Sequence, residues 1–259
     1  MPYLISEINL ERQELLAKVL APATNRLLSV LQLPSGARAL DLGCGIGGTT
    51  RQISRILDKP SEIVGLELNP DLVEAAKKLS SSEEDGLSFK QGDVSALGFA
   101  DNTFDFVFAR YLLMHLPEPE AVLKEMLRVC KPGGVVAAQE PDFSFQRCYP
   151  DSWAYERLPD LFRRLFPDPF LGPKVCLLFR KLGYGSSNVL VDCMVEVNQS
   201  DLRRCYRLSV EAMEKAVIEK GIYSEPEFER LLAELERVEK GQNILCVSNY
   251  IFSAWVLKR

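Results

Sequence analysis

Three glycines at alternate positions form the stretch of the chain with the clearest chemical character. Gly43, Gly45 and Gly47 follow a short apolar run that ends near Asp41, and a helix-compatible segment begins directly after them. Glycines let the backbone turn sharply and bring its amides close to a ligand, while the unpaired amides at the start of the following helix attract a carboxylate or a phosphate. The stretch therefore predicts a cofactor loop, in which Cys44 serves as a small packing side chain and not as a nucleophile.

Acidic residues distinguish this loop from that of a nicotinamide-binding domain, which has the pattern G-x-G-x-x-G. Asp41 precedes the glycines, where a carboxylate would repel a pyrophosphate but attract a ligand that carries an ammonium and a sulfonium. Glu67 ends the next predicted strand, in the position of an acid that accepts both hydroxyls of a ribose. Asp93 and Val94 follow the third strand, where a carboxylate and an amide could bind the edge of an adenine. An exposed acid at a strand end and a plain turn are the alternatives for Glu67 and Asp93.

Candidates for acting on a second substrate lie after the fourth and fifth predicted strands. His115 is the only histidine of the chain, and with an ordinary pKa of about 6.5 it could take a proton from a hydroxyl or an ammonium. Glu140 and Asp142 lie where the fifth strand ends, at the edge of a parallel sheet that binds ligands. Packing is the alternative for His115, and a solvated loop is the alternative for the two acids. Five aromatic side chains could build a pocket for that substrate, or could belong to the core or a lid: Tyr111, Trp153, Tyr155, Tyr206 and Tyr223.

Hydrophobic periodicity predicts alternating strands and helices that bring these residues to one edge of a sheet. Residues 7–33 are expected to form one or two amphipathic helices, interrupted at Pro22 and closed by Pro34. Five βα units then follow in a row, which predicts a parallel, doubly wound sheet with right-handed crossovers. The predicted strands of this half are 38–42, 62–67, a short strand around Phe89, 104–109 and 135–139.

The second half of the chain has a less regular pattern. Residues 142–170 are rich in Phe, Pro, Arg, Trp and Tyr without a clear period, which predicts an insertion folded over the site. Beyond it, helices are predicted at 172–182, 202–218 and 226–238, and strands at 189–197 and 246–257.

Composition limits the class of protein. The 259 residues, 47% of them hydrophobic, suffice for one large domain with insertions. Seven cysteines without a CxxC pair indicate neither a disulfide framework nor a zinc site, so no metal is predicted. No apolar run reaches the roughly 20 residues of a membrane span, and acidic residues lie where a signal segment would be. A net charge of -5 without a Lys/Arg tract argues against nucleic-acid binding. We therefore expect a soluble, cytoplasmic protein with neither a membrane nor a nucleic-acid partner.

Taken together, the motifs resemble those of the class I S-adenosylmethionine-dependent methyltransferases. The resemblance covers residues 28–258 and rests on ALDLGCGIGG, VGLELNP, FKQGDVSALGFADNTFDFVFARYLLMHL and LKEMLRVCKPGGVVAAQEPD, in that family's order and spacing. It implies a Rossmann-like, doubly wound α/β fold with a seven-stranded sheet, an antiparallel last strand and α-helical lid insertions. One departure is Gly98, where the family usually has proline.

The resemblance also implies S-adenosyl-L-methionine as the cofactor and S-adenosyl-L-homocysteine as the product. The glycine loop, including Cys44, would hold the methionine part. The other implied contacts are Glu67 to the ribose, Leu68 to one face of the adenine, Asp93 and Val94 to its edge, the Arg110 backbone to the methionine amine, and Tyr3 and Arg12 as lid residues.

The implied reaction moves the sulfonium methyl group to a nucleophile, and we expect an N or O atom of a small-molecule acceptor. Because the methyl group is already activated, alignment of the two reactants could supply up to ~7 to 11 kcal/mol of the acceleration without a dedicated base. Residues 1–33 are the expected lid, and residues 34–259 the methyltransferase domain, with insertions at about 143–170 and 199–241. The second insertion would form an acceptor pocket or a homodimer interface. The alternatives are a protein or RNA methyltransferase, a noncatalytic S-adenosylmethionine-binding regulatory protein and a nicotinamide oxidoreductase.

Overall fold

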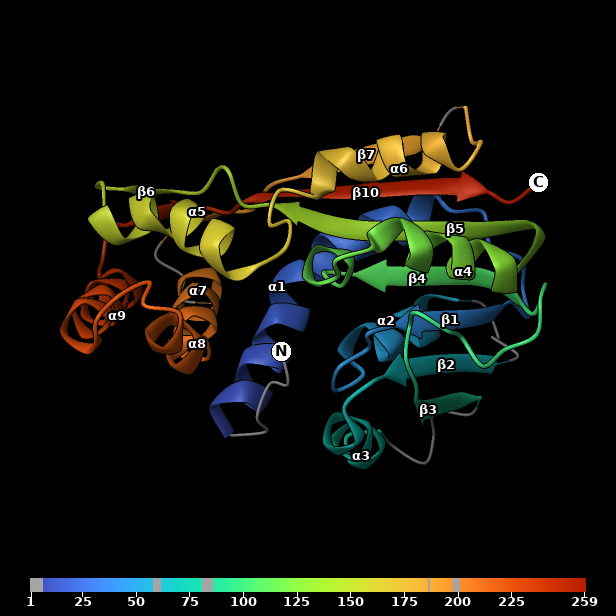
Figure 1. Cartoon of the computed structure of the whole chain (residues 1–259), viewed down its shortest axis with the longest axis horizontal. Helices are drawn as coiled ribbons and strands as arrows, with labels where there is room; N and C mark the ends of the chain where they lie inside the picture. The colour runs from blue at the N-terminus through green and yellow to red at the C-terminus, as the bar shows by residue number, and fades with distance from the viewer. Residues whose placement is uncertain (1–6, 58–61, 81–85, 186, 198–200) are drawn as a thin grey trace.

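The computed structural model describes residues 7–57, 62–80, 86–185, 187–197 and 201–259. Its centre is a seven-stranded sheet in the order β3-β2-β1-β4-β5-β10-β7 (Figure 1). The neighbours from β3 to β5 pair in parallel, whereas β10 is antiparallel to both β5 and β7. This confirms the predicted doubly wound sheet with an antiparallel last strand. The strands are β1 (Arg38–Leu42), β2 (Glu62–Glu67), β3 (Leu87–Gln91), β4 (Phe104–Arg110), β5 (Cys130–Asp142), β7 (Asn188–Asp192) and β10 (Tyr250–Leu257).

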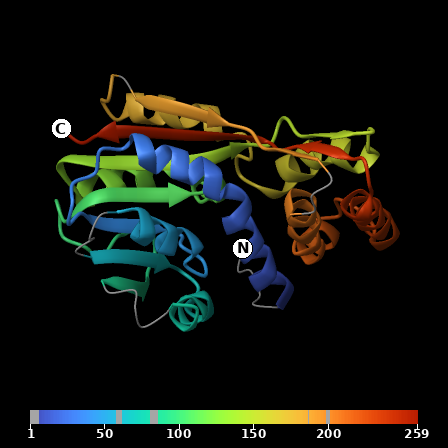
Figure 2. The ribbon, with the colours of Figure 1, turned by 180° about the vertical axis from the view of Figure 1, so that it is seen from behind.

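Helices cover both faces of this sheet, which explains why its inner strands are apolar throughout. Leu40 and Leu42 of β1 face one cluster of buried side chains, and Ala39 between them faces another. Helices α4 and α6 lie on the face that Figure 1 shows, and α1 and α2 lie on the face seen in Figure 2. The helices of this part are α1 (Glu7–Val30), α2 (Gly48–Ile56), α3 (Pro70–Lys78), α4 (Pro119–Val129) and α6 (Val175–Lys181).

Helix α1 continues through Pro22, so the predicted interruption there is wrong. A proline inside a helix removes one backbone hydrogen bond, but contacts on both sides of it hold α1 in place. Leu20 packs against Ile251 of β10. Thr24 Oγ1 donates to Gln139 Oε1 of β5 at 2.7 Å, and both side chains are buried. Helix α1 lies between the main sheet and the helices formed by residues 153–165 and 201–240 (Figures 1 and 2).

The strands of the second half continue beyond the main sheet into a smaller one. The predicted strand 189–197 is in fact two strands, β7 and β8, and the predicted strand 246–257 is β9 followed by β10. The two breaks lie side by side, because Ser248 N donates to Met194 O at 2.8 Å and Met194 N donates to Ser248 Oγ at 2.9 Å. The small sheet has the order β6-β9-β8. Its strands are β6 (Arg147–Tyr149), β8 (Val195–Val197) and β9 (Leu245–Val247).

The helices of residues 153–165 and 201–240, called the insertion below, lie beyond the carboxyl edge of the parallel strands (Figure 1). The predicted helix 202–218 is two helices, and residues 142–170 contain β6 and a helix. Buried side chains such as Tyr155 and Phe228 belong to the same apolar cluster as Phe104 of β4, so the insertion shares the core of the main domain. Among the described residues, no helix is long and apolar enough to cross a membrane. The helices are α5 (Trp153–Leu165), α7 (Asp201–Glu211), α8 (Glu214–Glu219) and α9 (Glu225–Lys240).

Candidate functional site

A cavity of about 380 Å³ lies at the carboxyl edge of the sheet. This volume falls in the range of small-molecule sites, roughly 300 to 1,000 Å³. One wall comes from the glycine loop and the ends of β2, β3 and β4, and the other from α1, α5 and α7. The structure thus brings together predicted residues from distant segments, whereas Tyr3 lies outside the described residues. The predicted residues in the wall are Arg12, Gly43, Cys44, Gly45, Glu67, Leu68, Asp93, Val94, Arg110, Tyr111, His115 and Tyr206.

The glycine loop has a backbone that few residues other than glycine adopt. Gly43, Gly45 and Gly47 have φ angles of 64°, 55° and 81°. A Cβ on Gly43 would meet Leu112 at 2.8 Å, and one on Gly47 would meet Phe89 at 2.5 Å. Gly47 is the N-cap of α2 and lies outside the cavity wall. Gly47 makes a tight turn against β3, and its predicted contact with the ligand stays a prediction.

Asp41 lies behind the loop and not in the cavity wall, and its predicted place among the cofactor-binding residues stays a prediction. Its side chain is 1% exposed and accepts a hydrogen bond from Thr50 Oγ1 at 2.7 Å. Burial raises the pKa of Asp41 to about 6, although Thr50 and the charge of Arg110 act in the opposite direction. Burial also lowers the pKa of Arg110 to about 10. Asp41 can thus favour a cationic ligand through its electric field alone.

Glu67, at the end of β2, supports the glycine loop with both carboxylate oxygens. Oε2 accepts from Gly45 N at 3.0 Å, and Oε1 accepts from Asn69 N at 3.0 Å. Each oxygen has a further lone pair, so the carboxylate can also accept the hydroxyls of a sugar. Asp93 and Val94 lie in the same wall. A hydrogen bond from a neighbouring backbone amide lowers the pKa of Asp93, which keeps this carboxylate ionised.

Helix α1 contributes a cavity residue that the sequence did not indicate. Gln13 Oε1 accepts from Ile46 N of the glycine loop at 3.2 Å. The fit is close, since a Cβ on Gly45 would clash with the Gln13 side chain. Gln13 lies in an amphipathic helix among other polar residues, so no motif marks it. Two ion pairs join α1 to α7 on the other side of the cavity: Lys18–Asp201 and Glu11–Arg204.

Glu140 lies outside the cavity wall, and its predicted role in orienting an acceptor stays a prediction. It is fully buried, and its carboxylate accepts from the amides of Leu112, Leu113 and Met114 at 3.0, 2.8 and 3.3 Å. Burial raises the pKa of Glu140 to about 8. Its observed role is to fix the segment 111–115, which includes a short 3-10 helix and two of the predicted site residues.

His115 lies in the cavity wall, with its ring edge-on to Phe166 and the two centroids 4.9 Å apart. Burial and the positive charge of Arg12 lower the pKa of His115 to about 4. The imidazole is therefore neutral at pH 7. It can accept a hydrogen bond, but it is a weaker base than an ordinary histidine.

Tyr111 and Tyr206 meet through Asn249, a residue that the sequence analysis did not single out. Asn249 Nδ2 donates to the Tyr111 hydroxyl at 3.0 Å, and the Tyr206 hydroxyl donates to Asn249 Oδ1 at 2.9 Å. The backbone amide of Asn249 donates in turn to the Tyr206 hydroxyl at 2.9 Å. All three residues line the cavity. Asn249 follows Ser248 as a polar pair inside an apolar run, which is the signal that could have drawn attention to it.

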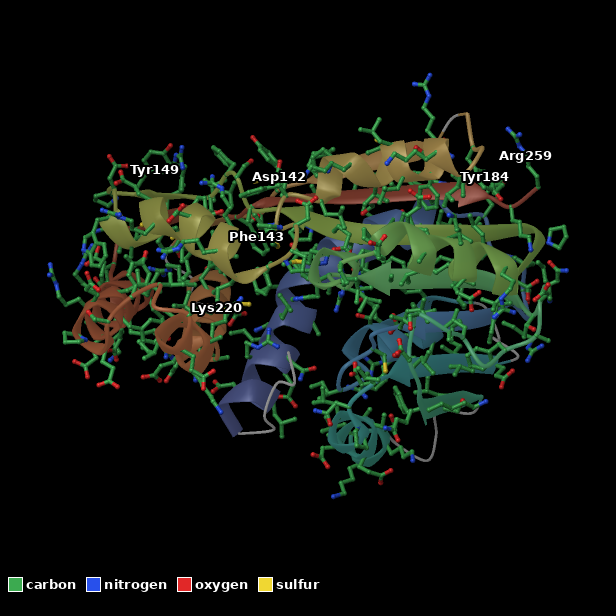
Figure 3. All side chains as sticks on the ribbon, in the orientation of Figure 1. Asp142, Phe143, Tyr149, Tyr184, Lys220 and Arg259 are labelled. Carbon is green, nitrogen blue, oxygen red and sulfur yellow. The ribbon has the colours of Figure 1, made fainter. Side chains whose placement is uncertain are left out.

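Five predicted acceptor residues lie outside the cavity wall: Trp153, Asp142, Glu140, Tyr155 and Tyr223. Trp153 begins α5 with 44% of its surface exposed. Asp142 ends β5, and its Oδ1 accepts from Ser144 N at 2.9 Å. Phe143, the first residue after β5, is buried and lines the cavity instead. Figure 3 shows Asp142 and Phe143 next to each other where the strand ends.

The sheet order, the antiparallel β10 and the glycine loop after β1 define a Rossmann-like domain of the class I methyltransferase fold. The family described as "Methyltransferase domain" matches residues 40–138, which run from β1 into β5 and include the loops around the cavity. Residues 40–138 of the chain are therefore similar to the methyltransferase domain, in keeping with the class I methyltransferase fold of the whole sheet.

Curated relatives share this part of the chain. The sterol 24-C-methyltransferase erg6 of Aspergillus fumigatus is 40% identical over 110 residues, which are 42% of this chain and 29% of that protein. A demethylmenaquinone methyltransferase of Bacillus licheniformis is 32% identical over 151 residues, 56% of this chain and 63% of that protein. The chain therefore spans less than two thirds of the length of either relative.

A solved structure extends the similarity in fold to most of the chain. The Haemonchus contortus phosphoethanolamine N-methyltransferase 2, in complex with phosphomonomethylethanolamine and S-adenosylhomocysteine, matches with a TM-score of 0.56 and 19% identity. The match covers 92% of this chain and 53% of that one. At this identity the similarity concerns the fold alone.

Proposed function

We propose that the protein transfers the methyl group of S-adenosylmethionine to a small-molecule acceptor. The observation that carries this proposal is the shared cavity. The glycine loop, Glu67 and Asp93 form one side of it, and apolar side chains of α1 and the insertion form the other. Residues 1–33 and the two insertions, at about 143–170 and 199–241, would act as the lid over the domain formed by residues 34–259.

The residues present fit this cofactor. The missing Cβ atoms of Gly43 and Gly45 leave room where Leu112 and Gln13 approach the loop. Glu67 has free lone pairs for ribose hydroxyls, and the field of buried Asp41 favours the positive charges of an ammonium and a sulfonium. When bound, the cofactor supplies a methyl group activated by a positively charged sulfur.

The protein's own part in the reaction is then to align two molecules and to exclude water. Leu68, Asp93 and Val94 would hold the adenine, and the backbone at Arg110 the methionine amine. Neutral His115 is the candidate for accepting a proton from the acceptor.

We propose oxygen or nitrogen as the accepting atom, with oxygen favoured. Among the described residues of the cavity wall, Glu67 and Asp93 are the carboxylates, and both lie on the cofactor side. A buried ammonium needs a partner of opposite charge, so an oxygen-bearing acceptor suits the other side better. Carbon is the alternative, because the name of the Aspergillus relative states methylation at a carbon.

Other functions remain as alternatives with different requirements. Methylation of a protein or an RNA would need a groove open to a long chain, whereas α1, α5 and α7 border this cavity. A noncatalytic regulatory protein would bind the cofactor without transferring its methyl group. A cytoplasmic location and a homodimer stay predictions.

Calorimetry and a transfer assay together test the proposal. We expect S-adenosylhomocysteine to bind and NAD not to bind, and a failure of the first would refute the proposal. Incubation with methyl-labelled cofactor and separate pools of small molecules, peptides and RNA should label the small molecules. Label in the peptide or RNA pool alone would replace the proposed acceptor class. Tight cofactor binding without transfer to any pool would favour the regulatory protein.

A further inference from the structure

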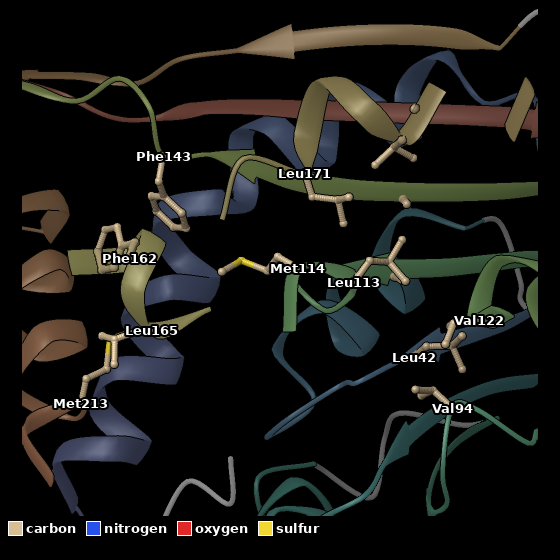
Figure 4. Close-up of a cluster of buried hydrophobic side chains, with 14 of the residues drawn as sticks. Leu42, Val94, Leu113, Met114, Val122, Phe143, Phe162, Leu165, Leu171 and Met213 are labelled. Atoms are coloured by element: carbon tan, nitrogen blue, oxygen red, sulfur yellow. The ribbon is translucent and has the colours of Figure 1, made fainter. Parts of the chain in front are cut away.

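The part of the cavity away from the glycine loop is mainly apolar. Phe143, Phe162 and Met213 face it from the insertion side, and Met114 faces it from the sheet side (Figure 4). The rings of Phe143 and Phe162 have centroids 4.5 Å apart. An acceptor that fills this space must be largely apolar, because burial of unpaired polar groups is costly.

A polar network of Tyr206, Asn249 and Tyr111 lies in this part, beside Ser209 of α7, and the hydrogen atoms of the network have a fixed direction. Asn249 Nδ2 donates to the carbonyl of Tyr250 at 2.9 Å, which identifies this end of the side chain as the amide nitrogen. The same nitrogen donates to the Tyr111 hydroxyl, and Asn249 Oδ1 accepts from Tyr206. Both hydrogens of the amide and the hydrogen of Tyr206 are therefore used within the network.

The hydroxyl hydrogen of Tyr111 is the one that remains. Its oxygen accepts from Asn249, and within the described parts of the chain the Tyr111 hydroxyl donates to no protein atom. Burial raises the pKa of Tyr111, so the hydroxyl keeps this hydrogen at neutral pH. The network thus presents one hydrogen-bond donor to the cavity.

The position of this donor separates it from the cofactor side. Tyr111 follows β4, and its hydroxyl reaches Asn249 at the start of β10, on the far side of β5. The glycine loop follows β1, which is the neighbour of β4 on the opposite side. The hydroxyl therefore points away from the glycine loop, toward the insertion.

The backbone at Tyr111 is held in an unusual conformation. Its φ is 53°, a left-handed value that is costly for a bulky residue. The conformation is maintained because Tyr111 N donates to Gln139 O at 2.8 Å and Glu140 holds the next three amides. Strain of this kind clusters at functional sites.

We propose that the Tyr111 hydroxyl binds the polar group of an uncharged, otherwise apolar acceptor, and that this group is a carbonyl or hydroxyl oxygen. The inference rests on the proposed function, since it concerns the acceptor side of the same cavity. It makes Tyr111 a binding residue that selects the acceptor, with Tyr206 and Asn249 as positioning residues behind it.

Four probes that share a naphthalene ring test this selection in the protein saturated with S-adenosylhomocysteine. They are naphthalene, 2-naphthol, 2-naphthoate and 1-naphthylmethylammonium, with affinities measured by calorimetry or by quenching of ring fluorescence. We expect 2-naphthol to bind most tightly, by about 10-fold over naphthalene, which is the size of a neutral hydrogen bond. In Tyr111→Phe this preference should disappear while naphthalene binds as before. Tyr184→Phe is the matched control, because Tyr184 lies beside Arg259 at the far end of the molecule (Figure 3).

Each of the remaining outcomes would overturn the inference. Tighter binding of the carboxylate or the ammonium probe would show a charged acceptor site. Equal losses for naphthol and naphthalene in Tyr111→Phe would reduce Tyr111 to a packing residue, and so would a lack of binding by all four probes. If Tyr111→Phe instead weakens the binding of S-adenosylhomocysteine, the hydroxyl belongs to the cofactor side. If the unmodified protein does not bind S-adenosylhomocysteine, the proposed function itself is refuted. A separate titration of the protein with S-adenosylhomocysteine measures this affinity.

Discussion

Replacement of the buried acid behind the glycine loop, Asp41→Asn, should stabilise the protein and weaken its cofactor site. Burial raises the pKa of Asp41 from its ordinary 3.8 to about 6, so ionisation at pH 7 costs the folded state free energy. At 1.36 kcal/mol per pKa unit, this cost is about 3 kcal/mol. Asparagine carries no charge and can still accept the hydrogen bond from Thr50. We therefore expect the free energy of unfolding to rise by about that amount, up to 3 kcal/mol.

The pH dependence gives this prediction its sign. Because the pKa of Asp41 is higher in the folded than in the unfolded state, its contribution to stability is fully present below 3.8 and is lost as the pH rises through about 6. The gain from Asp41→Asn in urea denaturation should thus be largest at pH 7 and fall below about 1 kcal/mol at pH 4. The exposed Asp151→Asn serves as the control, with an expected change within about 0.5 kcal/mol.

Asp41→Asn should weaken the binding of the cofactor while it raises the stability of the protein. Asp41→Asn removes a negative field near the proposed position of the ligand's ammonium, so calorimetry should show weaker binding of S-adenosylhomocysteine. A variant that is less stable than the unmodified protein at pH 7, or a gain that does not vary with pH, would refute this reasoning about Asp41.

Three further predictions concern the loop, the ribose acid and the histidine. Gly45→Ala forces a Cβ against Gln13 at a φ of 55°, and calorimetry should show at least ~10-fold weaker binding of S-adenosylhomocysteine. Gly98→Ala is the control, because no atom lies within 4 Å of its new carbon, and it should bind this ligand normally. Equal affinities of these two variants would contradict the close approach at the loop. Glu67→Gln should weaken the same ligand by about 10- to 100-fold, the range for hydrogen bonds to a charged group, and a loss below twofold would exclude the ribose role. His115 gives the one histidine ring signal in proton NMR and should titrate at about 4; since this pKa lies below the ordinary 6.5, its contribution to stability is complete above 6.5 and is lost as the pH falls toward 4. A midpoint near 6.5 would contradict its burial.

Local sequence patterns were sufficient for the features that depend on neighbouring residues. The glycine loop needs alternate glycines, and the strands of the parallel half need apolar runs of a definite length. For this reason the strands of the parallel half and the place of Glu67 at the end of β2 agree with the sequence analysis, whereas the antiparallel last strand followed from the family resemblance. The burial of Asp41 and Glu140 was not foreseeable in this way, because helices and loops from other segments cover them.

The features that the sequence did not predict depend on contacts between distant segments. Gln13 meets Ile46, and Asn249 meets Tyr111, across long stretches of chain without a motif at either end. The break between β9 and β10, after Val247, is accompanied by hydrogen bonds between Met194 and Ser248, which a continuous apolar run does not reveal. Periodicity therefore predicted one long strand where two sheets meet.

Three of the positions that cost stability lie near the cavity. Asp41 is a buried acid with a raised pKa, and Tyr111 is a bulky residue with a left-handed backbone. Glu140 is a second buried acid, which holds the segment that carries Tyr111. None of these features is required by the sheet order, since apolar residues and glycine would build the same strands at lower cost. Departures from local preference are expected where function requires them. Their location on both the cofactor side and the acceptor side is an argument that both halves of the cavity are maintained for binding.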